Sequence, residues 1–332
     1  MADIAITTEL QEIQNNLWGT NVRENIALAL EKLQNLPEEP NTIQGSLKNS
    51  KLSLLKVSIQ NMENTLQSRK DQLDRIKARL EQASGRTILQ YGKCGNDVYY
   101  AICDDGEAAL YGTGATYDYT FHDSVFYQNG QIKKIVLSNG ITGLGDRLFY
   151  HCANAETVSL PATLTSIGDS AFAQGDAVIN DTAGLTSVTI PQAVTAIRSY
   201  AFYHTAIAEV TVPASVKTWG KYVFSGCAKL KTARVACDSI GAFAFTRCTA
   251  LSSLTISANC RTFGENMLTY CESLTAITYE GTIAQWNAIT KPVNWMSSGE
   301  HSYNDYLKKI QCVDGYLEYD PENNVWNEVK NG

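Results

Sequence analysis

The sequence has few of the residues that enzymes and metal proteins use for chemistry. Its four histidines are isolated from one another: His122, His151, His204 and His301. The motifs of serine hydrolases, zinc proteases and phosphate-binding loops do not occur. Asp104, Asp105 and Gly106 form a turn signal, with calcium binding as the minor alternative. We therefore expect no enzyme activity, no metal site and no cofactor.

Long hydrophobic runs and an excess of positive charge are also absent. No run of about 18 apolar residues occurs, so we expect no insertion into a membrane. The N-terminus has neither a basic start nor a continuous apolar core, so we expect no secretory signal. The net charge is -7, and within residues 132–280 eleven Lys and Arg stand against ten Asp and Glu. Such a surface is a poor match for phosphates, so nucleic acid is not an expected partner.

One unit recurs between residues 132 and 280. In most copies a Gly is followed four residues later by a large apolar residue: Gly145/Phe149, Gly168/Phe172, Gly220/Phe224, Gly241/Phe245 and Gly264/Leu268, with Arg198/Phe202 in the remaining copy. Alternating apolar triplets such as Leu254-Thr-Ile256 accompany these pairs. The large apolar positions are 23, 30, 22, 21 and 23 residues apart. This period predicts a leucine-rich-repeat solenoid, because stacked units can share a core that a single unit cannot form.

Four of the nine cysteines follow the large apolar position by three residues: Cys152, Cys227, Cys248 and Cys271. We expect their buried thiols to bond neighbouring turns in a ladder. The ladder should be broken for two turns, where Gln174-Gly175 and Thr205 stand instead. Disulfides between adjacent turns are the alternative. Cys94 and Cys103 could also pair across a hairpin, and the sequence leaves that question open.

The flanks of the repeats divide the chain further. We predict a helical attachment region in 1–40, a coiled-coil stalk in 41–85, an N-terminal cap in 86–131, leucine-rich repeats in 132–280 and a C-terminal cap in 281–332. The caps are expected because a solenoid needs its open ends covered. The second unit carries about seven extra residues within 174–184, where solenoid insertions form loops. The predicted fold class is multidomain, with a helical stalk followed by a β-rich solenoid.

A heptad pattern runs through the predicted stalk. Its apolar seam consists of Leu52, Leu55, Ile59, Met62, Leu66, Leu73, Ile76 and Leu80. Arg69 interrupts the seam. Leu at the first heptad position with Ile at the fourth favours three or four strands over two, so we predict a homo-oligomer, with a trimer favoured. One long amphipathic helix packed on its own chain is the alternative.

Strand ends such as Leu160-Pro161, Ile190-Pro191 and Val212-Pro213, followed by turns such as Ile167-Gly-Asp-Ser-Ala-Phe172, recur in the unit. This pattern resembles the BspA-like leucine-rich repeats of bacterial surface proteins and some eukaryotic parasites. The segments 111–119 and 280–289 are similar to that family's caps, so the resemblance covers residues 95–319 or so. The resemblance implies adhesion or recognition, with no catalytic residues to carry over.

Residues 13–30, which contain Leu17-Trp-Gly-Thr-Asn-Val-Arg23, are similar to the start of tail-fibre, baseplate and receptor-binding proteins of phages of Gram-positive hosts. This resemblance implies that residues 1–40 dock to a phage tail or baseplate protein. The protein would then assemble in the host cytoplasm and reside in the virion tail. The alternatives are a BspA-like adhesin of the bacterial cell surface, whose signal peptide is missing from this sequence, and a scaffold protein without an extracellular role.

The candidate ligand-binding residues are ring-bearing side chains at repeat positions that we expect to face solvent: Tyr150, His151, Tyr203, His204 and Tyr222. Such side chains offer a large contact area at low entropic cost. Trp219 stands where neighbouring units have Ile, so we expect it to pack in the core, as we also expect of Trp286. The predicted ligand is a glycan or protein of a bacterial surface.

Overall fold

The computed structural model describes residues 53–54, 56–61, 63–65, 67–68, 71, 74–75, 77–78, 81–82, 85–175, 183–296, 306–320, 322–323 and 325–331. The chain divides into two units, Met1–Ile88 and Leu89–Gly332.

The described part of the first unit is helical. Every described residue between 53 and 82 has helical conformation, and Lys77 and Glu81 form an ion pair one helical turn apart. Ile59 is half-buried, and the other predicted seam residues lie outside the described residues: Leu52, Leu55, Met62, Leu66, Leu73, Ile76 and Leu80. The predicted attachment region, 1–40, also lies outside them. The coiled coil and the trimer therefore stay predictions.

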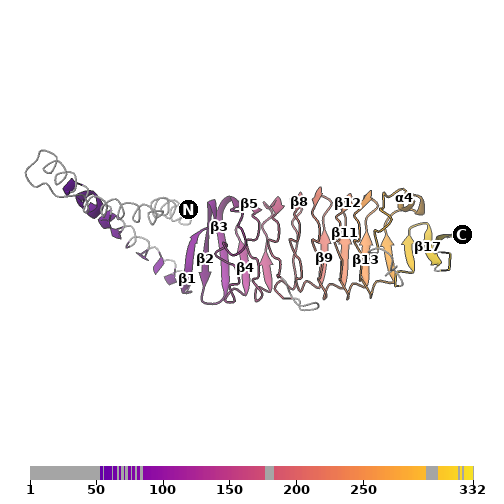
Figure 1. Ribbon diagram of the computed structural model, residues 1–332, viewed down its shortest axis with the longest axis horizontal. Coiled ribbons are helices and arrows are strands. Elements are labelled where there is room, and N and C mark those ends of the chain that lie inside the picture. Colours follow the sequence, from indigo (N-terminus) through magenta and orange to yellow (C-terminus); the bar gives the residue numbers. More distant parts are fainter. Residues whose placement is uncertain are drawn as a thin grey trace, which may run out of the picture. The chain divides into compact units, whose positions relative to one another are not determined.

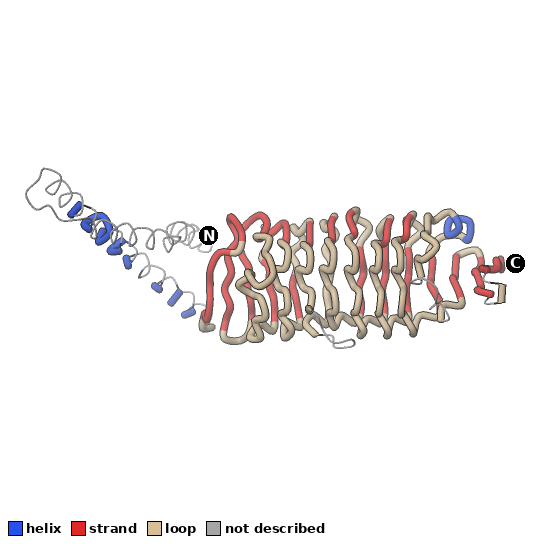
Figure 2. The backbone as a smooth tube through the Cα atoms, in the orientation of Figure 1, coloured by secondary structure: helices blue, strands red, loops and turns tan. Residues whose placement is uncertain are grey.

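The second unit is a β-solenoid of about seven turns, as the repeat period predicts. Strands on two faces alternate with tight turns (Figures 1 and 2). The longer strands lie on one face: β4 (Lys134–Leu137), β6 (Thr157–Ser159), β9 (Glu209–Val212), β11 (Thr232–Val235), β13 (Ser253–Ile256) and β15 (Ala276–Tyr279). Two-residue strands and β5 lie on the other: β5 (Ile141–Leu144), β7 (Ser166–Ile167), β8 (Ala196–Ile197), β10 (Thr218–Trp219), β12 (Ser239–Ile240) and β14 (Thr262–Phe263).

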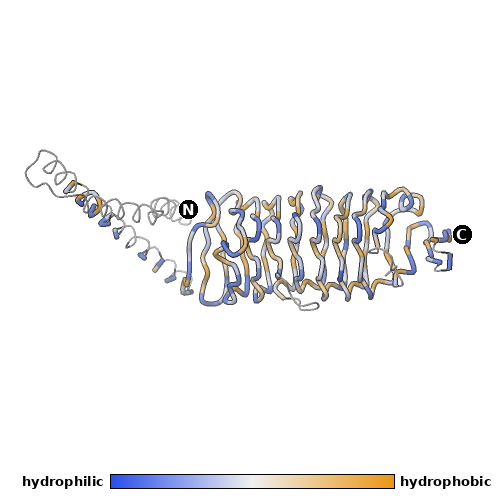
Figure 3. The backbone as a smooth tube through the Cα atoms, viewed as in Figure 1, coloured by the Kyte–Doolittle hydropathy of each residue, from blue (hydrophilic) through white to orange (hydrophobic). Residues whose placement is uncertain are grey.

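The long-strand face has a constant register, so equivalent residues lie side by side. Val210 pairs with Ala233, Ala233 with Leu254, and Leu254 with Ile277. These four residues are buried, whereas flanking residues such as Thr232 are exposed. Hydrophobic and hydrophilic residues alternate along the turns accordingly (Figure 3). The triplet around Val188 differs, because its turn carries the insertion and its strand is reduced to one bridge between Thr157 and Ser187.

Antiparallel strands close the N-terminal end of the solenoid. They are β1 (Ile88–Lys93), β2 (Gly95–Cys103) and β3 (Glu107–Thr116). The first half of β3 pairs with β4 and its end pairs with β5, so one long strand provides the edge of both faces. The β2–β3 turn contains Asp105, whose carboxylate accepts a hydrogen bond from the Glu107 amide, and Gly106 at φ 86°. Its structural role is therefore that of a turn.

A helix and a hairpin follow the last repeat. Helix α4 (Ile283–Asn287) begins with a capping box of Thr282 and Gln285. Its Trp286 is 3% exposed, so the expectation that it packs in the core is confirmed. Strand β16 (Lys309–Cys312) continues the parallel face, and β17 (Gly315–Asp320) and β18 (Val325–Lys330) add antiparallel strands.

Six phenylalanines form a continuous stack inside the solenoid. This inner column consists of Phe126, Phe149, Phe172, Phe202, Phe224 and Phe245. Their ring centroids are 4.7 to 5.8 Å apart, and each ring is at most 1% exposed. Leu268 takes the next place at 6% exposure. Trp219 packs against Phe224 and Phe245 and is half-buried, in partial agreement with its expected core position.

A glycine precedes four of the six rings by four residues, and close backbone packing requires it. A Cβ atom at Gly168 would lie 2.5 Å from the carbonyl carbon of Gly145, and one at Gly220 would lie 2.3 Å from the Ser199 nitrogen. Contacts this short exclude any side chain unless the turns move apart. The spacing between turns therefore depends on these glycines.

The predicted cysteine ladder is present, and its bonds run to the inner column. Each thiol donates to the carbonyl oxygen of the phenylalanine one turn earlier, over 3.0 to 3.2 Å: Cys152 to Phe126, Cys227 to Phe202, Cys248 to Phe224 and Cys271 to Phe245. All nine cysteines are buried and none forms a disulfide, so neither Cys94–Cys103 nor the adjacent-turn pairs are bridged in this structure. Where the ladder is broken, the Gln174 amide donates to Phe172 instead.

Candidate ligand-binding surface

One surface position of the solenoid has left-handed backbone in every repeat. It is the second residue after the glycine position, and its occupants are Arg147, Ser170, Tyr200, Tyr222, Phe243 and Asn266, with φ between 52° and 59°. We call this set the outer column. Each residue points its amide along the solenoid axis to a carbonyl of the next turn, as Ser170 does to Ser199 at 2.9 Å. The unusual backbone therefore serves the bonding between turns.

Three members of the outer column are aromatic, and their rings stack. The Tyr200 and Tyr222 ring centroids lie 4.8 Å apart, and those of Tyr222 and Phe243 lie 4.3 Å apart, with planes within 9°. Tyr200 is 38% exposed, while Tyr222 and Phe243 are half-buried. Burial raises the pKa of the Tyr222 phenol. These rings fill no part of the core, so the fold alone does not account for them.

A second aromatic cluster covers the N-terminal turns. Phe121, which is 58% exposed, meets the Tyr150 ring edge-on at 5.9 Å. Tyr127 stacks on Tyr150 at 6.0 Å, and Tyr150 meets His151 edge-on at 4.4 Å. The guanidinium of Arg147 lies 4.5 Å from the centre of the Phe121 ring.

The structure divides the candidate ligand-binding residues between these two clusters. Tyr150 and His151 belong to the first, and both are half-buried. Tyr203 and Tyr222 each contact Tyr200, at 5.4 and 4.8 Å, and are half-buried. Tyr200, Phe243 and Phe121 were missed by the sequence analysis. For Tyr200 and Phe243 the available signal was their shared offset from the glycine position, which is also that of Tyr222.

His204 corrects the expectation that it faces solvent, because it is only 5% exposed. Its imidazole lies over Gly226 of the next turn, where a Cβ atom would come within 2.2 Å of the ring. Because Gly226 has no side chain, the His204 ring can pack directly against the backbone of the next turn. Its Nδ1 atom is buried with no hydrogen-bond partner. Burial, and then the charge of Arg247, lower the pKa of His204. We therefore leave His204 out of the proposed contact surface. His151 lies against Gly175 in a similar way.

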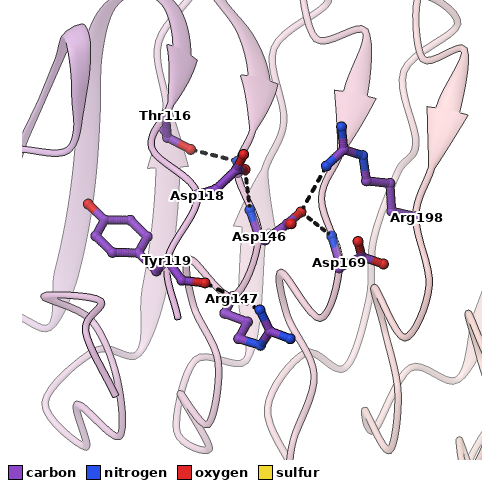
Figure 4. Close-up of polar contacts among 8 residues, drawn as sticks. Thr116, Asp118, Tyr119, Asp146, Arg147, Asp169 and Arg198 are labelled. Carbon is purple, nitrogen blue, oxygen red and sulfur yellow. Dashed lines mark hydrogen bonds and ion pairs between the residues drawn. The ribbon is translucent and has the colours of Figure 1, made fainter. Parts of the chain in front are cut away.

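Carboxylates form a short polar ladder beside the outer column (Figure 4). The Asp118 carboxylate accepts from the Asp146 amide at 2.9 Å, and the Asp146 carboxylate accepts from the Asp169 amide at 2.7 Å. The Arg198 guanidinium reaches back to Asp146 at 3.1 Å. No hydrogen bond or ion pair among the described residues uses the Asp169 carboxylate, which is half-buried.

Among the described residues, burial keeps several thiols protonated, and no cluster of ligands for a metal ion occurs. Burial raises the pKa of Cys152, Cys227 and Cys271 to about 12, so these thiols stay protonated at neutral pH. Within the described part of the chain, no group of three or more His, Cys, Asp or Glu could hold a metal ion. Within the same part, no helix has both the length and the apolar character needed to cross a bilayer.

The comparison with protein families matches this repeat directly. The pattern of the BspA type leucine rich repeat region occurs in six copies, over residues 119–180 and 175–289, which is just over half of the chain. The chain belongs to the BspA-type leucine-rich repeat family. This assignment confirms the resemblance seen in the repeat residues. The match begins after the predicted stalk, so it gives no support to the phage resemblance of residues 13–30.

Several crystal structures of leucine-rich repeat proteins are similar to this BspA-type chain. One from Eubacterium ventriosum is 18% identical and covers 67% of this chain and 93% of its own, with a TM-score of 0.34. One from T. pallidum is 20% identical over 56% and 87%, with a TM-score of 0.38. A leucine rich cell surface protein from Faecalibacterium prausnitzii is 15% identical over 64% and 99%, with a TM-score of 0.28. No curated protein matches the chain.

Proposed function

We propose that this BspA-type protein is a non-enzymatic adhesin of the bacterial cell surface, and that its solenoid recognises a surface glycan or protein. The supporting observation is the outer column, because Tyr200, Tyr222 and Phe243 are aromatic at positions that the core does not use. The left-handed backbone at this position recurs in every repeat and serves the bonding between turns, so the support comes from the aromatic residue type and not from the backbone. The proposed contact residues are Tyr150, His151, Tyr203 and Tyr222, with Tyr200 and Phe243 added.

Binding of the fluorescently labelled full-length protein to intact bacterial cells tests the proposal. The informative variant is Tyr200→Ala/Tyr222→Ala, and the matched control is Thr211→Ala/Thr255→Ala on the long-strand face. We expect the tyrosine variant to bind at least about tenfold more weakly, and the threonine control to bind as the wild type does. Equal loss in both variants would move the contact to the strands, and no binding to any cell panel would refute recognition of bacterial surfaces.

The tail-protein interpretation keeps the same recognition role but assigns the protein to a virion. It depends on residues 1–40 and on the apolar seam, which lie outside the described residues apart from Ile59. The family match favours the cell-surface alternative, because it concerns the repeats alone. Docking of residues 1–40 to a phage tail or baseplate protein therefore stays a prediction.

A further inference from the structure

The outer column carries a planar group at every position except Ser170. In chain order its members are Arg147, Ser170, Tyr200, Tyr222, Phe243 and Asn266, and the rings of Tyr200, Tyr222 and Phe243 stack on one another. Ser170 is half-buried and has no planar group. We call the space above Ser170, between the side chains of Arg147 and Tyr200 on the two adjacent turns, the Ser170 gap.

The backbone hydrogen bonds show that the turn at Ser170 is in register with its neighbours, so the gap arises from the small side chain alone. The amides of Arg147, Ser170 and Tyr200 donate to Asp169, Ser199 and Lys221, at 2.7, 2.9 and 2.9 Å. The three φ angles are 55°, 54° and 59°. Ser170 therefore occupies the same place in its turn as the ring-bearing residues occupy in theirs, and a ring is absent only because this residue is small.

The two neighbours of the gap present flat groups. Tyr200 is more exposed than Tyr222, as expected if only one face of its ring is stacked on a neighbour. Arg147 is held by Phe121 at 4.5 Å and by the Tyr119 carbonyl at 3.3 Å, and its Nε is buried without a hydrogen-bond partner. Strands of adjacent turns lie about 4.8 Å apart, so groups two turns apart leave room for one ring between them.

The polar groups beside the gap select the kind of ring. The Asp169 carboxylate accepts no hydrogen bond among the described residues, so it is available to a hydroxyl donor. The Arg198 side chain, which is 51% exposed, lies beside the Asp169 carboxylate and forms an ion pair with Asp146. Two arginines and two aspartates surround the gap, so the local charge is balanced. A phenylalanine of a partner protein would offer the Asp169 carboxylate no donor and a tyrosine or tryptophan only one, whereas a pyranose ring carries several hydroxyl donors.

We propose that the Ser170 gap binds one neutral pyranose ring of a surface polysaccharide. The C–H face of the sugar stacks on Tyr200, one hydroxyl donates to Asp169, and Arg198 donates to a ring or hydroxyl oxygen. This inference rests on the proposed recognition function and names the ligand class and the turn that binds it. The remaining rings, Tyr222 and Phe243, support Tyr200 from behind.

Calorimetric titration of the full-length protein with neutral oligosaccharides of glucose, galactose, mannose and N-acetylglucosamine tests the proposal. Ser170→Tyr fills the gap with a residue that the neighbouring turns already accept in this backbone conformation. Asp169→Asn removes the charged acceptor, and Thr255→Ala on the long-strand face is the control. We expect the first two variants to bind at least about tenfold more weakly than the wild type, and the control to stay within about twofold. Thermal unfolding of each variant checks that it is folded.

Two outcomes overturn the proposal: no oligosaccharide binds, or Ser170→Tyr binds as well as the wild type. Cell binding then separates the inference from the proposed function. If wild type and Ser170→Tyr bind cells equally well, the gap is not the site but the adhesin function stands. If the wild type binds no cells, both fail.

Discussion

The inner and outer columns lie two residues apart in every turn, yet they meet different environments. Phe202 and Phe224 are 0% exposed, with rings 5.2 Å apart and 3° from parallel. Tyr200 and Tyr222 stack at a similar distance, 4.8 Å, but they lie at the surface and on left-handed backbone. The inner rings are explained by the core that they fill. The outer rings stack in the same way but fill no part of the core. The comparison therefore separates side chains that the solenoid needs for its core from side chains that lie only on its surface.

The sharpest test of this comparison removes one ring from each column. We expect Phe224→Ala to lower the free energy of unfolding by about 3–5 kcal/mol, because it opens a cavity in a packed core. Phe243→Ala should cost clearly less, because its half-buried ring opens no core cavity and loses one aromatic contact worth about 0.5–1.5 kcal/mol beyond its buried area. Urea unfolding of both variants measures the difference. Similar values for the two would mean that the outer column is also structural.

The cysteine ladder predicts that stability falls in alkaline solution. Burial raises the pKa of Cys227 and Cys271 to about 12, whereas an unfolded thiol titrates near about 8.5. Above that pH the unfolded chain releases protons that the folded chain retains, so unfolding becomes more favourable as pH rises toward 12. The free energy of unfolding should be flat from pH 7 to 8 and fall from pH 9 to 11. A Cys227→Ala variant should show a shallower fall, and an unchanged slope would show that these thiols are not the cause.

His204 predicts a smaller loss of stability in acid. Its pKa is lowered by burial and then by Arg247, so the folded protein resists protonation of this ring. Its contribution is complete above the unfolded value of about 6.5 and is lost as pH falls through the folded pKa. Stability should therefore decrease between pH 7 and pH 5, and less so in His204→Asn, where Asn tolerates the same left-handed backbone. Identical pH profiles would assign the loss to other groups.

The smallest effect is expected at Tyr222. In Tyr222→Gly, relief of about 1–2 kcal/mol of left-handed strain offsets most of the loss of two ring contacts, each of about 0.5–1.5 kcal/mol. The melting temperature should therefore change little. Tyr222→Val should be clearly less stable than Tyr222→Gly, because a β-branched residue fits this backbone poorly. If the glycine variant is the less stable of the two, the strain argument is wrong.

The repeat period predicted the solenoid well because each prediction used residues that the core requires. Gly168 and Phe172 follow from close packing and burial, and Cys248 follows from its constant distance to the ring position. These constraints are local and recur in each turn, so a single sequence displays them several times.

The surface was harder to predict because it depends on the neighbouring turn. His204 is buried because Gly226, a residue of the next unit, leaves space for its ring. The Ser170 gap exists only by comparison with Tyr200, one turn later. Neither relation appears within a single repeat, and both become visible when the repeats are aligned on their glycine position.

The amides of the left-handed residues allow the number of turns in this solenoid to vary. Because each of them bonds only to the adjacent turn, a duplicated or deleted unit would find the same donors and acceptors on both sides. Evolution can then lengthen or shorten such a protein by whole units, and the rings on its surface keep their spacing while their number and order change.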